Sequence, residues 1–154
     1  MEILSEQFGF CGKVKCYASS AALQSEVVQS RQGHPTLLLE FARKGGSGYA
    51  WGEKVSFQLT DRDLPLWAAV VLGKSNETKM SFHGTENDKA VEVKKNPRSK
   101  GLLVVNTSPK GAIAVPVSPE DQFWLATQCL RVFKARAPDV EGLAVIHLLG
   151  SLVA

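Results

Sequence analysis

The stretch KVSFQLTDRDLPLWAAVVLG, residues 54–73, has the pattern of a strand followed by a capped helix. Its first residues alternate apolar with polar, which is the period of a strand with one buried face. Thr60 then stands three residues before Asp63, a spacing that resembles the capping box, in which a hydroxyl accepts a hydrogen bond from an unpaired backbone N–H. A helix-period apolar run follows. The apolar residues of strand and helix are Val55, Phe57 and Leu59, then Leu64, Trp67, Ala68, Val71 and Leu72.

The same order of features recurs in AIAVPVSPEDQFWLATQCLRVF, residues 112–133. Here Ser118 stands three residues before Asp121, and Pro119 occupies the first helical position, where its missing N–H would have been unpaired in any case. Two strand-cap-helix units in one chain predict an internal duplication. The units superpose Val55 on Ile113, Phe57 on Val115, Leu59 on Val117, Thr60 on Ser118, Asp63 on Asp121, Ala68 on Ala126 and Leu72 on Leu130.

Further strand candidates precede each helix. Residues 23–30 are ambiguous between a strand and a short helix, and Pro116 cannot donate to a ladder, so its strand should lie at an edge or a bulge. We therefore expect an α+β fold made of a duplicated ββββα unit, about residues 11–75 and 76–136, with two antiparallel four-stranded sheets and the helices on one side. The remaining candidates are residues 13–18, 36–42, 78–83, 89–94, 102–106 and 112–117.

Composition limits the classes of protein that fit. A chain of 154 residues has the size of about one domain, so residues 1–154 are expected to fold as one. No stretch reaches the roughly 18 to 20 apolar residues that a membrane helix needs, and the N-terminus has no secretory-signal layout. Three cysteines without CxxC spacing favour a reduced, cytoplasmic setting. The formal net charge of +3 is a mild indication of a polyanionic partner.

The two ends of the chain carry separate expectations. Residues 1–10 predict a poorly fixed arm. Residues 139–154 are almost wholly apolar after Glu141, and so many aliphatic side chains would form a large patch if water surrounded them. This tail either packs onto its own domain or seals a subunit interface, and the sequence does not choose between the two.

Motifs for catalysis or metal binding are missing from the sequence. The three histidines, His34, His83 and His147, lie at no ligand spacing with Cys, Asp or Glu, and no Gly-x-Ser-x-Gly elbow occurs. Glycines 45, 46 and 48 lack the lysine and the following helix of a phosphate loop, and so favour a hairpin. We therefore expect no catalytic residue, no metal and no cofactor.

Basic and aromatic residues gather in three places, and this combination holds single-stranded nucleic acid. They lie on one face of the 13–18 strand, just after the glycine hairpin, and in a basic hairpin near residue 97. Stacking contributes about 1–3 kcal/mol per base, so a few exposed rings matter more than net charge. The candidate nucleic-acid-binding residues are Lys13, Lys15, Tyr17, Tyr49, Trp51, Lys54, Lys94, Lys95, Arg98 and Lys100.

The order of these residues resembles the Whirly family of single-stranded DNA-binding proteins. The main match is YAWGEKVSFQLTDRDLPLWAAVVLGKSNETKMSFHG at residues 49–84, where the family has Tyr-x-Trp, an alternating strand, and a Ser/Thr-capped helix ending in Leu-Gly. Val-Pro-Val-Ser at residues 115–118, before a helix carrying Phe123, is a second match. A third is CGKVKC at residues 11–16, set against the family's Lys-Gly-Lys-Ala-Ala-Leu.

The resemblance implies two packed four-stranded sheets, helices that assemble a homotetramer, and DNA held along sheet surfaces between subunits with little base preference. By position, Gly12 and Lys13 fall on the family's Lys-Gly-Lys strand, and Tyr49 and Trp51 fall on its aromatic pair. Cys11 replaces the first lysine of that strand, so its roles in DNA contact and in higher assembly stay open. Plant members carry organelle-targeting extensions that are missing here, which would suit a bacterial or phage-like cytoplasmic relative.

The sequence therefore predicts a non-catalytic single-stranded DNA-binding protein of low sequence specificity, acting in repair, recombination or transfer as a homotetramer or a larger oligomer. Stacking does not distinguish the sugar, so an RNA-binding relative stays open as an alternative. A structural oligomer subunit that binds no nucleic acid is the other alternative.

Overall fold

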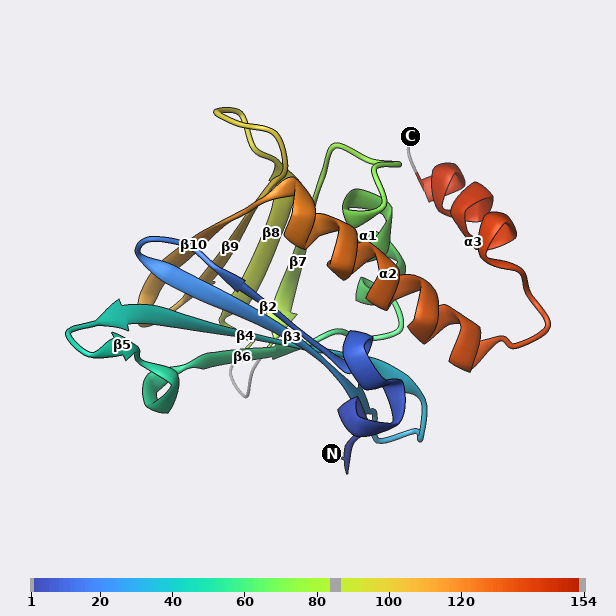
Figure 1. Ribbon diagram of the computed structural model, residues 1–154, viewed down its shortest axis with the longest axis horizontal. Helices are drawn as coiled ribbons and strands as arrows, with labels where there is room; N and C mark the ends of the chain where they lie inside the picture. The colour runs from blue at the N-terminus through green and yellow to red at the C-terminus, as the bar shows by residue number, and fades with distance from the viewer. Residues whose placement is uncertain (1, 84–86, 153–154) are drawn as a thin grey trace.

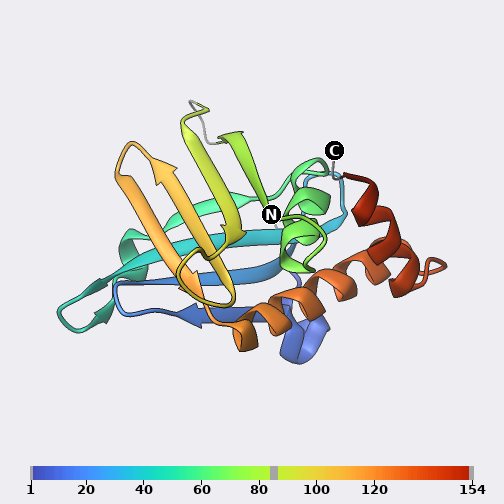
Figure 2. The same ribbon diagram turned by 90° about the horizontal axis from the view of Figure 1, so that it is seen from above.

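The computed structural model describes residues 2–83 and 87–152, with the backbone alone for Phe82 and His83. Its strands form two antiparallel sheets that cross at an angle, and the helices gather on one side of them (Figures 1 and 2). The predicted α+β class and the arrangement of helices on one side are confirmed.

The first sheet is built around two long central strands. Its six strands are β1 (Glu2–Ile3), β2 (Lys13–Tyr17), β3 (Ala21–Gln29), β4 (Pro35–Gly45), β5 (Gly48–Tyr49) and β6 (Val55–Gln58). β1 and β2 pair with one edge of β3, while β5 and β6 pair with the far edge of β4. The four main strands agree with the prediction, and the ambiguous segment 23–30 is a strand. The two-residue strands β1 and β5 were not predicted.

The second sheet is a simple meander in the order β10-β9-β8-β7. Its strands are β7 (Glu77–His83), β8 (Lys89–Lys95), β9 (Leu102–Ser108) and β10 (Gly111–Val117). Pro116 lies on β10, which is an edge strand, so its missing N–H removes no bond from the interior of the sheet. The predicted edge position of this strand is confirmed.

A helix follows each sheet in the chain. The helices are α1 (Asp63–Val71), α2 (Pro119–Arg136) and α3 (Gly142–Leu149), with short 3-10 helices η1 (Ser5–Gly12), η2 (Trp51–Glu53) and η3 (Gly150–Leu152). Figure 1 shows α1, α2 and α3 together on the side away from the β4–β5 hairpin. Among the helices of the described residues, none has the length and apolarity needed to cross a bilayer.

Both predicted helix caps are present. At the first helix the Asp63 N–H donates to Thr60 Oγ1 at 3.2 Å, and the Thr60 N–H donates to the Asp63 carboxylate at 3.0 Å, which completes a capping box. At α2 the Asp121 N–H donates to Ser118 Oγ at 3.1 Å, with Pro119 as the first helical residue. Caps of this kind stabilise a helix by about 1 kcal/mol, so local sequence favours a helix start at both places.

One hydrophobic cluster joins both sheets and all three α-helices. Trp67 of α1, Phe41 of β4 and Phe57 of β6 are its largest fully buried aromatic residues. Within it, Gln128 of α2 is fully buried and uses both ends of its amide. Its Oε1 accepts from Ser25 Oγ at 2.6 Å, and its Nε2 donates to the backbone carbonyls of Cys11 and Ser25 at 2.9 and 3.0 Å. This network fixes α2 against β3 and η1.

The N-terminal segment corrects one prediction. Residues 1–10 were expected to form a poorly fixed arm, and Met1 lies outside the described residues. Residues 2–10 are held, because β1 pairs with β3, the Leu4 N–H donates to the Val27 carbonyl at 3.0 Å, and Leu4 and Phe8 are buried in the core. Long-range burial, which the local pattern does not reveal, holds this segment in place.

The apolar tail packs in part onto its own chain, which is one of the two alternatives left open by the sequence. Helix α3 lies against α1 and α2, and its Leu149 is only 4% exposed. Leu143 on the same helix is 79% exposed, and Leu148 and Leu152 are exposed as well. One side of the tail therefore packs onto its own chain, and the other side presents leucines to the outside.

Candidate nucleic-acid interface

The side chains of β2 define an outward face of the first sheet. Lys13, Lys15 and Tyr17 are exposed, while Val14 and Cys16 between them are buried in the core. The predicted placement of these three candidates on one strand face is confirmed. Tyr17 is 54% exposed, so its ring is accessible to a stacked base.

Cross-strand register extends this surface across the other strands, and we call it the outer face. Residues opposite one another in neighbouring antiparallel strands point to the same side of a sheet. The three rows of the outer face contain Lys13, Glu26, Leu38 and Gln58; Lys15, Gln24, Glu40 and Ser56; and Tyr17, Ala22 and Ala42. Basic and aromatic residues therefore lie exposed at the β2 edge. The row members on β3 and β4 are buried, and they include the apolar residues Ala22, Leu38 and Ala42 as well as Gln24, Glu26 and Glu40.

Two carboxylates at the centre of the outer face partly neutralise its lysines. Glu26 lies 3.5 Å from the Lys13 ammonium, and Glu40 lies 3.0 Å from the ammonium of Lys54, which directly precedes β6. Glu40 also accepts hydrogen bonds from the Gln24 amide at 3.2 Å and the Ser56 hydroxyl at 3.1 Å. Lys54 therefore joins the outer face through Glu40, while Lys15 lies opposite the neutral Gln24.

These acids were absent from the sequence-based candidate set. Glu26 and Glu40 are each only 5% exposed, and buried charges are seldom found unpaired. The signal that could have found them is the phase of their strands, since both alternate with apolar residues that face the core. The outer face is thus a mixed polar surface rather than a purely basic one.

The predicted aromatic pair has two different environments. The Tyr49 hydroxyl donates to the Ala18 carbonyl at 2.6 Å, and its ring centroid lies 5.2 Å from that of Tyr17. The Lys44 ammonium lies 5.8 Å from the Tyr49 ring centroid, within the range of a cation–π contact. Tyr49 thus supports Tyr17 from the β4–β5 hairpin, while Trp51 is half-buried in η2.

The predicted basic hairpin lies on the other sheet. Lys94 and Lys95 end β8, and Arg98 and Lys100 occupy the turn to β9. Lys95, Arg98 and Lys100 are exposed, while Lys94 forms an ion pair with Glu92 at 3.4 Å. Figure 1 shows this hairpin above the start of α2, apart from the β2–β3 and β4–β5 hairpins at the left. The structure therefore does not bring these four cations onto the outer face.

Comparison with known proteins finds likeness among solved structures. No protein-family model and no curated protein matches the chain. Solved structures similar to it include WHY1 from Arabidopsis thaliana, with a TM-score of 0.61 and 20% identity over 80% of this chain and 88% of that one. WHY3 from Arabidopsis thaliana has a TM-score of 0.59 and 19% identity, over 80% of this chain and 86% of that one. The plant transcriptional regulator PBF-2 has a TM-score of 0.60 and 17% identity, over 91% of this chain and 95% of that one. The chain has a Whirly fold.

In this Whirly fold, position 12 has a structural need for glycine. A Cβ at Gly12 would overlap the backbone carbonyl of Ser5, because η1 turns back on itself immediately before β2. The glycine of the CGKVKC segment therefore permits the close approach that starts β2, and the lysine after it, Lys13, reaches the outer face. Cys11, which replaces a lysine of the family pattern, is buried and faces no solvent.

Two cysteines of this Whirly fold, Cys16 and Cys129, are packed in the core. No group of three or more His, Cys, Asp or Glu that could hold a metal occurs among the described residues. Burial raises the pKa of the Cys129 thiol to about 12, and burial with the nearby Asp121 carboxylate raises that of Cys16 to about 12. Both thiols are therefore protonated and shielded near neutral pH, as packing residues are.

The sequence did not predict an exposed aromatic cluster at the start of α2. Phe10 is 75% exposed, Phe123 is 60% exposed, and Trp124 lies between them with ring centroids 4.9 and 5.0 Å away. Phe10 comes from η1 and the other two from the first turns of α2. Adjacent exposed rings of this kind mark a contact surface. The adjacent Phe123 and Trp124, soon after the Ser118 cap, were the feature of the sequence that could have indicated this cluster.

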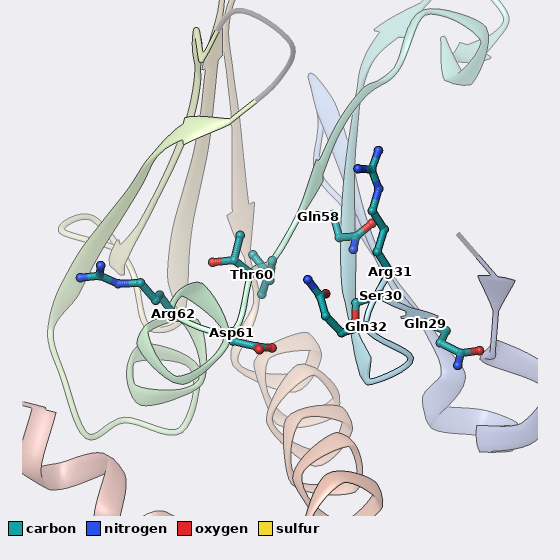
Figure 3. Close-up of a pocket in the computed structure, with 9 residues that line it drawn as sticks. Gln29, Ser30, Arg31, Gln32, Gln58, Thr60, Asp61 and Arg62 are labelled. Atoms are coloured by element: carbon teal, nitrogen blue, oxygen red, sulfur yellow. The ribbon is translucent and has the colours of Figure 1, made fainter.

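A pocket of about 710 Å³ opens where the β3–β4 turn meets the β6–α1 loop (Figure 3). Gln32 points into the space between the two loops, Arg31 extends upward in the view past Gln58, and Arg62 points away from the pocket. Asp61 on its rim pairs with Arg136 of α2 at 2.8 Å. Gln58 also ends the first row of the outer face, so the pocket adjoins that face at the end remote from Tyr17.

Proposed function

We propose that this protein is a non-catalytic single-stranded DNA-binding protein that uses the outer face of the first sheet. The observation that supports this most is the row pattern of that face. Lys13, Lys15 and Tyr17 lie exposed along one edge, Lys54 lies at the opposite edge, and the side chains of β3 and β4 between them are at most 9% exposed. Cations for phosphate and a ring for stacking are the two components that hold unpaired strands.

The lysines of the outer face contribute unequally. Lys15 lies opposite the neutral Gln24, so its ammonium is not shared with a carboxylate across the strand pair. Lys13 and Lys54 already meet Glu26 and Glu40, so each must share its ammonium between a carboxylate and a phosphate. If about three to five phosphates are neutralised, the logarithm of affinity falls with the logarithm of salt concentration at a slope of roughly −2 to −3.5.

Base preference is expected to be low. Every base has a π-face, so stacking on Tyr17 does not select among the four. The Gln24 amide and the Glu40 carboxylate are nearly buried and already bonded to one another at 3.2 Å, so they offer little to base edges. A Whirly fold also occurs in PBF-2, a plant transcriptional regulator, which is compatible with DNA as the partner.

We further propose assembly into a homotetramer or a larger oligomer through the helical side. The support is the exposed apolar surface there: the ring cluster of Phe10, Phe123 and Trp124, and the outward leucines of α3. This surface also favours the alternative of a structural subunit that binds no nucleic acid. We assign the DNA-binding function to repair, recombination or transfer in the cytoplasm.

The proposal is tested by titrating fluorescently labelled oligo-dT at several salt concentrations, with matched RNA as a competitor. We expect binding that weakens as salt rises, with unlabelled DNA displacing the labelled oligo-dT better than RNA does. Better displacement by RNA would favour the RNA alternative. Replacing Tyr17 by Ala should weaken binding by about tenfold, since one stacked base contributes about 1–3 kcal/mol. Absence of salt-sensitive binding, with light scattering still showing an oligomer, would leave the structural-subunit alternative.

A further inference from the structure

Three lysines from three separate segments line one small pocket between the two sheets. Lys54 precedes β6 of the first sheet, Lys89 is the first residue of β8, and Lys110 lies in the turn from β9 to β10. The pocket has a volume of about 250 Å³, and its lining also contains Val55, Asp88, Ser108 and Pro109. Neither Lys89 nor Lys110 is among the candidates that the sequence suggested.

Hydrogen bonds hold Lys89 through its side chain and Lys110 through its backbone. The Lys89 ammonium donates to the Ser56 carbonyl of the first sheet at 3.2 Å, so its half-buried side chain is already oriented toward the pocket wall. The backbone carbonyl of Lys110 accepts from the Arg43 guanidinium at 3.2 Å, and the Lys110 N–H donates to Ser108 Oγ at 3.2 Å. The Arg43 guanidinium also binds the Ala112 carbonyl at 3.1 Å, so β4 holds the β9–β10 turn against the first sheet.

The charges around the pocket are not balanced by its own lining. Among the described residues that line it, Asp88 is the sole carboxylate beside three ammonium groups. Lys54 shares its charge with Glu40 at 3.0 Å, which leaves Lys89 and Lys110 facing a single acid. Like charges brought together in this way repel one another, and a bound anion removes the repulsion.

We propose that this pocket binds a phosphate group of the single-stranded DNA, at the point where the strand passes from the first sheet to the second. This inference rests on the proposed function. Lys54 belongs both to the outer face, through Glu40, and to the pocket lining, so a strand that follows the rows from β2 to β6 reaches the pocket at the β6 edge. A phosphodiester carries one negative charge and acceptor oxygens, which match the excess positive charge and the ammonium donors.

The test replaces Lys89 and Lys110 together by Gln and compares the double variant with Lys74→Gln. Lys74 is exposed and lies between α1 and the start of β7, whereas Lys89 pairs with His83 at the end of β7. This control therefore removes a charge far from the pocket. The double variant should bind oligo-dT about tenfold more weakly, because hydrogen bonds to charged groups are lost. Its salt slope should become shallower by about 0.7, the value for one lost phosphate contact on a single strand. Lys74→Gln should leave both quantities close to wild type.

Two further measurements test the role of charge and the source of the phosphate. Lys89→Arg keeps the charge and should retain the wild-type salt slope, which separates electrostatics from damage to the fold. Inorganic phosphate and pyrophosphate are titrated by NMR on the amides of Ser108 and Lys110, and only weak shifts are expected. Tight pyrophosphate binding, with oligo-dT affinity unchanged in the double variant, would assign the pocket to a free phosphate compound and overturn the proposal.

Failure of this inference is distinguishable from failure of the proposed function. If wild-type protein binds oligo-dT and the Lys89→Gln, Lys110→Gln variant binds it with the same affinity and salt slope, the pocket takes no part and the proposed function stands. If wild-type protein shows no salt-sensitive binding, both are refuted.

Discussion

Charge reversal at Lys15 and at Lys13 should have different effects, although both lysines are exposed on the same face of β2. Lys15 lies opposite the neutral Gln24, whereas Lys13 lies 3.5 Å from Glu26. Lys15→Glu should therefore remove a proposed phosphate contact and leave the fold unchanged. Lys13→Glu also places a new carboxylate beside one that is almost fully buried.

The magnitudes follow from these environments. Two unit charges about 4 Å apart interact by about 1 kcal/mol in bulk water and by about 4 kcal/mol near a protein surface, and salt screens the exposed pair further. For Lys15→Glu we expect a loss of about 1–2 kcal/mol in binding to oligo-dT, and a change of less than about 0.5 kcal/mol in the free energy of unfolding. For Lys13→Glu we expect a comparable loss in binding and an additional destabilisation of about 1–2 kcal/mol, because like charges directly opposite each other weaken strand pairing.

The assay combines fluorescence anisotropy of labelled oligo-dT with urea unfolding of the same samples. Lys13→Gln is the matched control, because it removes the pair with Glu26 without adding a like charge. The reasoning is refuted if Lys15→Glu binds as tightly as wild type, or if Lys15→Glu and Lys13→Glu lower the free energy of unfolding equally.

Three further outcomes are expected. Gln128→Leu should lower the free energy of unfolding by about 3 kcal/mol, because it leaves the Ser25 hydroxyl and two buried carbonyls without partners, and a urea midpoint near wild type would contradict the network. The free energy of unfolding should fall as pH rises from about 9 to 12, by up to about 1.4 kcal/mol per pH unit for each buried thiol, because Cys16 and Cys129 lose their protons more readily in the unfolded chain. Cys16→Ala should make this dependence on pH less steep, and an unchanged dependence would contradict the role of the Cys16 thiol. Replacing Phe123 and Trp124 by Ser should reduce the mass measured by light scattering without loss of secondary structure, and an unchanged mass would remove the ring cluster from the proposed interface.

Local signals in the sequence were sufficient for the main elements of the fold. Alternating residues mark most of the longer strands, although the segment of β3 was ambiguous between a strand and a short helix. The hydroxyl-to-carboxylate spacings at Thr60 and Ser118 mark the starts of α1 and α2. The interior of each element was therefore predictable, because period and capping depend on near neighbours in the chain. The strands β1 and β5 have two residues each, which is too short for any period to appear.

Features that depend on distant parts of the chain were not predictable in the same way. The N-terminal segment is fixed by Leu4 and Phe8, whose partners lie on other elements. The candidate residues of β2 were found because their alternation is local, but the carboxylates that meet Lys13 and Lys54 come from β3 and β4. Likewise, Lys89 and Lys110 approach Lys54 only because the two sheets cross.

The acidic centre of the outer face has a consequence for the kind of polyanion that it can accept. Duplex DNA is stiff and carries about one negative charge per 1.7 Å of its length, so it cannot keep all its charges away from Glu26 and Glu40. A flexible unpaired strand can place its sugar-phosphate chain over the lysines at the margins and turn its uncharged bases toward the middle. In the proposed function, Glu26 and Glu40 would thereby disfavour paired nucleic acid by occupying two of the lysines that its closely spaced phosphates need.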